Sequence, residues 1–134
     1  MPHLSRLLIR SALVYLGLGF SLGALLLANK GIPFAPFIWG LLPAHIEFLL
    51  LGWFLQLAFG VAYWILPRLG HGPGRGKESL VWISFILLNL GIWLVAADNF
   101  VLLKWPAALG RLSQALAAGL FIYANWRRIK PFAR

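Results

Sequence analysis

The sequence predicts an all-α protein, an integral membrane antiparallel four-helix bundle. The first observation behind this fold class is composition, since 61% of the 134 residues are hydrophobic and only 11% are charged. A soluble domain carries more charge than this to cover its surface. The second is that four apolar runs are each long enough to cross the ~30 Å hydrocarbon core of a bilayer. The third is that the basic residues gather at the ends of these runs.

The whole chain, residues 1–134, is predicted to be a single transmembrane domain. Its four helices are expected at about residues 7–28, 43–66, 79–103 and 106–126. Pro43 and Pro106 stand at first helical positions, where a missing backbone N–H costs nothing. The apolar segment before Pro43 is expected at the membrane interface. The first run is longer than the core of a signal peptide, so we expect a retained helix rather than a cleaved leader.

The basic residues predict the orientation of the helices. Nine of the 12 Lys and Arg residues belong to the N-terminus, the 68–78 loop or the C-terminus, and three belong to the two opposite connections: Lys30, Lys104 and Arg111. By the positive-inside rule, both termini are cytoplasmic and the protein is a multi-pass protein of the inner (plasma) membrane. The same rule accounts for the net charge of +9, so the lipid bilayer is expected as a partner and nucleic acid is not.

His45 is the only histidine that lies within one of the apolar runs. An ionisable side chain in such a place is a functional-site hypothesis by default. At about 100° per residue, its helix face is shared by Leu49, Gly52, Gln56 and Phe59. An imidazole, apolar walls and a missing side chain at Gly52 would suit a haem. The periodicity is equally compatible with an interfacial histidine that is hydrogen-bonded to a neighbour.

Other polar residues of the spans have simpler expected roles. Glu47 lies about 200° around the helix from His45, so the two cannot bind one ion together. In the first turn, its carboxylate is expected to interact with the helix dipole, with Lys30 or Lys104 as a nearby cation and proton transfer as the alternative role. Gln56 and Asn89 lie at similar depths, and we expect them to hold the bundle together, a mutual bond being one option.

The second run resembles the second transmembrane helix of subunit I of the haem–copper oxidases, and that of short membrane proteins similar to this subunit. The matching pieces, within about 25 residues, are Ala44-His45, Gly52-Trp53, Gly60-Val61-Ala62-Tyr63-Trp64 and Pro67-Arg68. The resemblance implies that His45 is an axial ligand of a haem b. Many short relatives read His-Ala-His where this chain has Pro43-Ala44-His45. The copper-ligand histidines have no counterpart, so this chain alone is not expected to be an oxygen-reducing enzyme.

Two functions are open on these grounds. The first is a membrane b-type haem-binding protein that transfers electrons or binds a diatomic gas such as nitric oxide or oxygen, with a respiratory-chain redox partner. The second is a cofactor-free structural or accessory subunit of a respiratory membrane complex. In the first case, the haem carboxylates would point outward to Lys30, Lys104 or Arg111. Arg111 is preferred because a guanidinium binds a carboxylate bidentately.

The sequence also favours a homodimer. A lone membrane histidine leaves the sixth position of a haem iron empty, or open to another protein or to a second copy of His45. Glycines on the first two helices allow the close backbone approach that helix association in membranes requires. These glycines are Gly17, Gly19, Gly23, Gly52 and Gly60.

Overall fold

The structure is a computed structural model that describes residues 1–68, 77–100 and 105–129. These residues are almost entirely helical, which confirms the all-helical class. The elements are α1 (His3–Gly31), the 3₁₀-helix η1 (Pro36–Leu41), α2 (Leu42–Glu47), the π-helix η2 (Phe48–Leu55), α3 (Gln56–Ile65), α4 (Glu78–Ala97), the 3₁₀-helix η3 (Asp98–Phe100), α5 (Pro106–Asn125) and the 3₁₀-helix η4 (Trp126–Arg128).

Four stretches of these helices are long and apolar enough to cross a membrane. They are His3–Gly31, Pro36–Ile65, Glu78–Phe100 and Pro106–Arg128. The first is longer at both ends than the predicted 7–28. At its start, Leu4 and Ser5 are buried and hold the first turn against the molecule. The predicted end of the third helix, at residue 103, lies outside the described residues.

The second span is continuous but changes its helix type. It starts as a 3₁₀-helix at Pro36, in the segment expected at the interface, and becomes α-helical at Leu42, next to the expected start at Pro43. Residues Phe48–Leu55 then form a π-helix. A π-helix places more residues in each turn than the 3.6 of an α-helix. The stripe expected at 100° per residue therefore does not run straight from His45 to Gln56.

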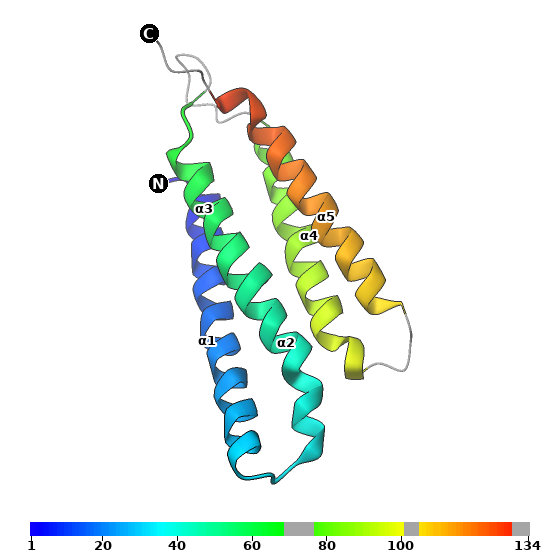
Figure 1. The fold of residues 1–134 in the computed structure, drawn as a ribbon. Helices are drawn as coiled ribbons and strands as arrows, with labels where there is room; N and C mark the ends of the chain where they lie inside the picture. The colour runs from blue at the N-terminus through cyan, green and yellow to red at the C-terminus, as the bar shows by residue number, and fades with distance from the viewer. Residues whose placement is uncertain (69–76, 101–104, 130–134) are drawn as a thin grey trace.

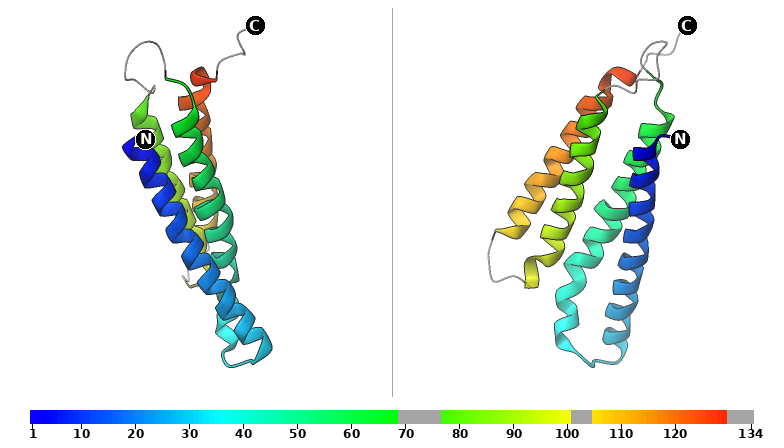
Figure 2. Two further views of the ribbon diagram at one scale, coloured as in Figure 1. Left: turned by 90° about the vertical axis from the view of Figure 1, so that its left-hand side faces the viewer. Right: turned by 180° about the vertical axis from the view of Figure 1, so that it is seen from behind.

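The four spans are arranged as two helix pairs (Figure 1). The N-terminal pair is α1 packed along α2, η2 and α3, and the C-terminal pair is α4 packed along α5. The pairs meet mainly where α2 and η2 face α4. Figure 2 shows from two further sides that α1 and α5 lie on opposite sides of the molecule. The start of α1 and the end of η4 lie at the same end of the molecule (Figure 1).

Glycines bring the helices of the N-terminal pair close together. A Cβ atom at Gly23 would lie 2.6 Å from Cε1 of His45, and a Cβ atom at Gly19 would overlap Leu49. The small residues of α1 therefore receive side chains of the chain's own second span. Gly17 differs, because a Cβ atom there would meet nothing within 4 Å.

The C-terminal pair uses glycine on both helices. A Cβ atom at Gly91 of α4 would lie 2.7 Å from the carbonyl oxygen of Gly110, and one at Gly110 would lie 2.8 Å from that of Gly91. Backbone meets backbone at this crossing. Ser84 and Ser113 support it by donating to the carbonyl oxygens of Ala117 and Leu87, each at 2.7 Å.

Candidate functional site

Among the described residues, most of the buried polar side chains that bond across helices lie where the two helix pairs face each other. We call this contact the inter-pair seam; it has α2, η2 and α3 on one side and α4 and α5 on the other. Glu47 is 2% exposed and Gln56 is completely buried. Buried polar groups are costly unless they are hydrogen-bonded, so the partners of these side chains define what the seam can do.

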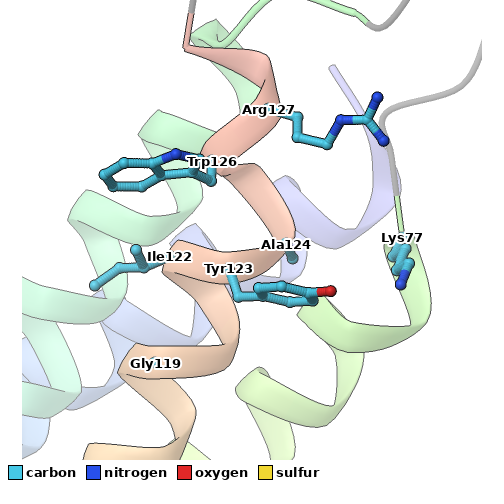
Figure 3. A pocket seen from close by; sticks show the side chains of 7 residues that line it. All are labelled: Lys77, Gly119, Ile122, Tyr123, Ala124, Trp126 and Arg127. Atoms are coloured by element: carbon cyan, nitrogen blue, oxygen red, sulfur yellow. The ribbon is translucent and has the colours of Figure 1, made fainter.

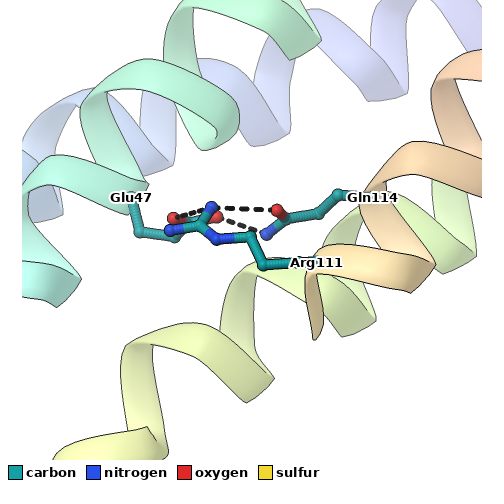
Figure 4. A network of polar contacts seen from close by, with 3 residues as sticks. All are labelled: Glu47, Arg111 and Gln114. Atoms are coloured by element: carbon teal, nitrogen blue, oxygen red, sulfur yellow. Dashed lines mark hydrogen bonds and ion pairs between the residues drawn. The ribbon is translucent and has the colours of Figure 1, made fainter. Parts of the chain in front are cut away.

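The first polar cluster of the seam joins the end of α2 to α5 (Figure 4). Arg111 Nη1 donates to Oε2 of Glu47 at 2.8 Å and to Oε1 of Gln114 at 3.0 Å. Gln114 Nε2 donates to the other carboxylate oxygen of Glu47. Arg111 and Gln114 are three residues apart and so lie on one face of α5. Both oxygens of a buried carboxylate are thereby bonded to one helix of the opposite pair.

This cluster corrects the expectation for Glu47. The residue is the last of α2, not part of a first helical turn, and its ion pair is with Arg111. Lys30 is not its partner, and Lys104 lies outside the described residues. Arg111 was expected to bind a haem carboxylate, and the carboxylate it binds in the structure is that of Glu47. The sequence does not identify Gln114 as a partner of Glu47, because no pattern links an uncharged residue on one helix to a carboxylate on another.

The second polar cluster lies farther along the seam. Asn89 Nδ2 of α4 donates to Oε1 of Gln56 at 2.9 Å, which confirms the bond weighed from the sequence. Tyr15 of α1 donates its hydroxyl to Oδ1 of Asn89 at 2.8 Å. Nε2 of Gln56 is buried and has no hydrogen-bond partner among the described residues. A side chain from each of three spans therefore meets at this level.

The third cluster lies at the end of the molecule that holds the termini. Arg128 is completely buried. Its guanidinium donates to the carbonyl oxygens of Tyr63 at 2.9 Å, Leu66 at 2.6 Å and Pro67 at 3.0 Å, and to Oδ1 of Asn125 at 2.6 Å. The last carbonyl groups of a helix lack intrahelical donors and carry partial negative charge. Arg128, which the sequence treats only as a topological charge, thus caps the C-terminus of α3.

His45 is packed inside the N-terminal pair rather than in the seam. Its Nδ1 lies 2.7 Å from the carbonyl oxygen of Gly19, and its ring covers Gly23. A backbone carbonyl on Nδ1 favours the tautomer with a proton there. This arrangement matches the second of the two hypotheses for His45, a histidine that is hydrogen-bonded to a neighbour.

The other residues predicted to line a haem also have neighbours in the chain. Leu49 packs on Gly19. A Cβ atom at Gly52 would overlap the ring of Tyr15, so this side chain fills the space expected for a flat group. The predicted haem face is therefore turned toward α1 over the stretch from His45 to Gly52.

A haem does not fit on this face as the residues are arranged. The nearest cavity between the first three spans has a volume of about 280 Å³ and an apolar lining that includes Leu22, Ala44, Phe48 and Trp93. His45, Leu49 and Gly52 do not line it. The predicted ligand therefore does not face this cavity.

Comparison with known proteins adds no assignment. Neither a protein-family model, nor a curated protein, nor a solved structure matches the chain. The resemblance of the second span to an oxidase helix therefore stays a prediction that depends on the residues quoted for it.

Proposed function

We propose that the chain is an integral membrane protein, an antiparallel four-helix bundle of the inner (plasma) membrane with cytoplasmic termini. Its four helices of suitable length and apolarity support this placement. The excess of basic residues in the N-terminus, the 68–78 loop and the C-terminus supports the orientation. A cysteine introduced at Gly31 is expected to react with an impermeant reagent from outside, and one at Gly74 only after permeabilisation. The reverse pattern would contradict the orientation.

We further propose that the protein is a cofactor-free structural or accessory subunit of a respiratory membrane complex. The observation that carries this proposal is the ring of Tyr15 against Gly52, which fills the space that a haem on the His45 face would need. The resemblance of the second span to an oxidase helix supports the respiratory setting. Three inter-pair clusters that bond polar side chains to one another and to backbone support a structural role.

The second candidate is a b-type haem protein that uses His45 for electron transfer or gas binding. One observation favours it. Nδ1 of His45 is engaged by the Gly19 carbonyl, which leaves Nε2 without a hydrogen-bond partner in the described part of the chain. Ligating histidines usually have this second bond on the ring nitrogen that does not bind the metal. In this candidate, a bound haem would require α1 to lie elsewhere along the stretch from Gly19 to Gly23.

A visible spectrum of the detergent-purified protein separates the two candidates. After expression with an ample haem supply, the first predicts no Soret band. A Soret band that disappears in the His45→Ala variant, and persists in variants at His3 and His71, would replace the first candidate by the second. The helix is expected to insert in every case, because one imidazole contributes little to it.

We also propose a homodimer. The support on the first helix is Gly17, where a small residue borders open space and a second copy could approach closely. Gly19, Gly23, Gly52 and Gly60 do not add to this support, because side chains of the same chain cover them. The mass of the detergent complex, corrected for bound detergent, is expected to correspond to two chains. A single chain would contradict the proposal.

A further inference from the structure

A large cavity lies between the start of α4 and the end of α5. Its volume is about 670 Å³. The lining consists of Lys77, Gly119, Ile122, Tyr123, Ala124, Trp126 and Arg127. None of these residues takes part in the three clusters of the seam. The proposed structural role therefore leaves the cavity unexplained.

The cavity has a cationic side and an apolar side (Figure 3). Lys77 and Arg127 lie on the side toward which the hydroxyl of Tyr123 points, and Ile122 and Trp126 lie on the other. Nζ of Lys77 is 5.5 Å from the centroid of the Tyr123 ring, a cation–π distance that holds the ammonium group near the cavity. Both cations are therefore placed to meet one negatively charged group.

Gly119 widens the apolar part. It lines the cavity, and a Cβ atom there would meet nothing within 4 Å, so the absent side chain leaves this part of the cavity open, a space that we call the hollow. Arg127 follows Gly119 by eight residues, a rise of about 12 Å along a helix. In the proposed orientation, the cations lie at the cytoplasmic interface and Gly119 lies within the hydrocarbon. Ile122, which is 55% exposed, borders the same hollow.

We propose that this cavity binds an anionic phospholipid of the cytoplasmic leaflet. The phosphate lies between Lys77 and Arg127, Trp126 lies at the level of the headgroup, and an acyl chain follows the hollow at Gly119. Charge complementarity selects an anionic lipid, because Lys77 and Arg127 line the cavity. Their acidic neighbour Glu78 is not among the lining residues. This inference rests on the proposed membrane insertion and is independent of whether the protein carries haem.

The test measures lipid binding to the full-length protein in detergent by native mass spectrometry. Phosphatidylglycerol is titrated against phosphatidylcholine of the same acyl chains. The unmodified protein is expected to prefer phosphatidylglycerol. Each of Lys77→Gln and Arg127→Gln is expected to weaken phosphatidylglycerol binding about fivefold. Arg68→Gln, which removes an exposed cation outside the cavity at the same end, is expected to change it less than twofold by the same reasoning.

A second variant tests the acyl part of the site without a change in charge. Gly119→Leu fills the hollow and is expected to weaken phosphatidylglycerol binding, whereas Gly31→Leu adds the same side chain in open space at the end of α1 and leaves it unchanged. Equal binding of both lipids, or equal effects of Gly119→Leu and Gly31→Leu, would overturn the proposal. So would displacement of the lipid by inorganic phosphate alone, which would assign the cations to free phosphate.

The membrane placement is measured separately, by retention of the protein in carbonate-washed membranes. Retention together with failed lipid selectivity would overturn only the lipid site. Release from the membranes would overturn the proposed membrane insertion and, with it, the lipid site.

Discussion

Glycine dominates the closest contacts inside each helix pair, whereas the polar contacts between the pairs use long side chains. Within the C-terminal pair, Gly91 and Gly110 bring two backbones together, and the absence of side chains makes the contact. Between the pairs, Glu47 reaches Arg111 and Gln114 through long polar side chains. The first kind of contact depends on shape and the second on the presence of a particular partner.

This difference matters most in a lipid environment. Burial of apolar surface does not drive helices together in lipid, so close packing and interhelical hydrogen bonds do. Packing at glycine is lost when a side chain is added. A polar contact is lost when either partner is removed, and the remaining partner is then buried alone. The two helix pairs should therefore behave as packed units joined by a seam that single polar substitutions can open.

The largest effect is expected from Arg111→Leu. The variant leaves the Glu47 carboxylate buried with Gln114 as its remaining donor, and removal of one partner of a buried pair costs about 3 kcal/mol. Arg111 itself is 58% exposed, so in Glu47→Leu the guanidinium can turn outward from the molecule. That variant should lose only about 1 kcal/mol. Unfolding by SDS in mixed micelles measures both.

The double variant Glu47→Leu/Arg111→Leu provides the control for this asymmetry. With no buried carboxylate left, its stability should equal that of Glu47→Leu, because the cost in Arg111→Leu comes from the unpaired charge. Equal losses in the two single variants would contradict the asymmetry, and losses that add in the double variant would show that the two side chains are not coupled.

The next effect is expected inside the C-terminal pair. In Gly91→Ala, the new Cβ atom would lie 2.7 Å from a backbone oxygen, and the helices must separate at a cost of about 2 kcal/mol. Gly119→Ala in α5 is the matched control, because its Cβ atom meets open space and alanine favours a helix by up to about 1 kcal/mol. A stable Gly91→Ala variant would mean that the backbones of α4 and α5 are not in contact.

The sequence predicts well what depends on one helix at a time. The helical class, four long apolar stretches and a helix start close to Pro43 follow from hydropathy and proline position. The bond between Gln56 and Asn89 can be predicted because sequential helices place polar residues of equal depth side by side. These inferences need only a local pattern and the thickness of a bilayer.

The sequence fails where two distant helices decide the outcome. Glu47 and Arg111 are 64 residues apart, and nothing in either helix indicates which faces meet. The π-helix over Phe48–Leu55 changes the angle between successive side chains, so a constant 100° per residue assigns the residues after it to the wrong helix face. The space expected to be open at Gly52 is filled by Tyr15, because the ring of a neighbouring helix can pack where a side chain is absent.

A smaller effect is expected from Asn89→Leu in the middle of the seam. The variant removes the bonds to Tyr15 and Gln56, and interhelical side-chain bonds in membrane proteins contribute about 0.6 kcal/mol each on average. A loss of about 1 kcal/mol in the SDS titration is therefore expected by this reasoning. A loss below that of Tyr15→Phe, which removes only one of the two bonds, would contradict the shared role of Asn89.

The smallest effect is expected from Ser5→Ala, which probes a polar contact inside a helix pair. Ser5 Oγ donates to the carbonyl oxygen of Gly60 at 2.6 Å, and Gly60 also packs closely against Leu8 and Ile9. Because the packing survives the substitution, the loss should not exceed about 0.6 kcal/mol. The control is Ser21→Ala, whose hydroxyl bonds within α1 to a carbonyl four residues earlier and joins no two helices. Its stability should be unchanged or slightly higher, since alanine is the better helix former. If Ser5→Ala instead lost as much as Arg111→Leu, the N-terminal pair would also depend on single polar partners, and the distinction between pair and seam would fail.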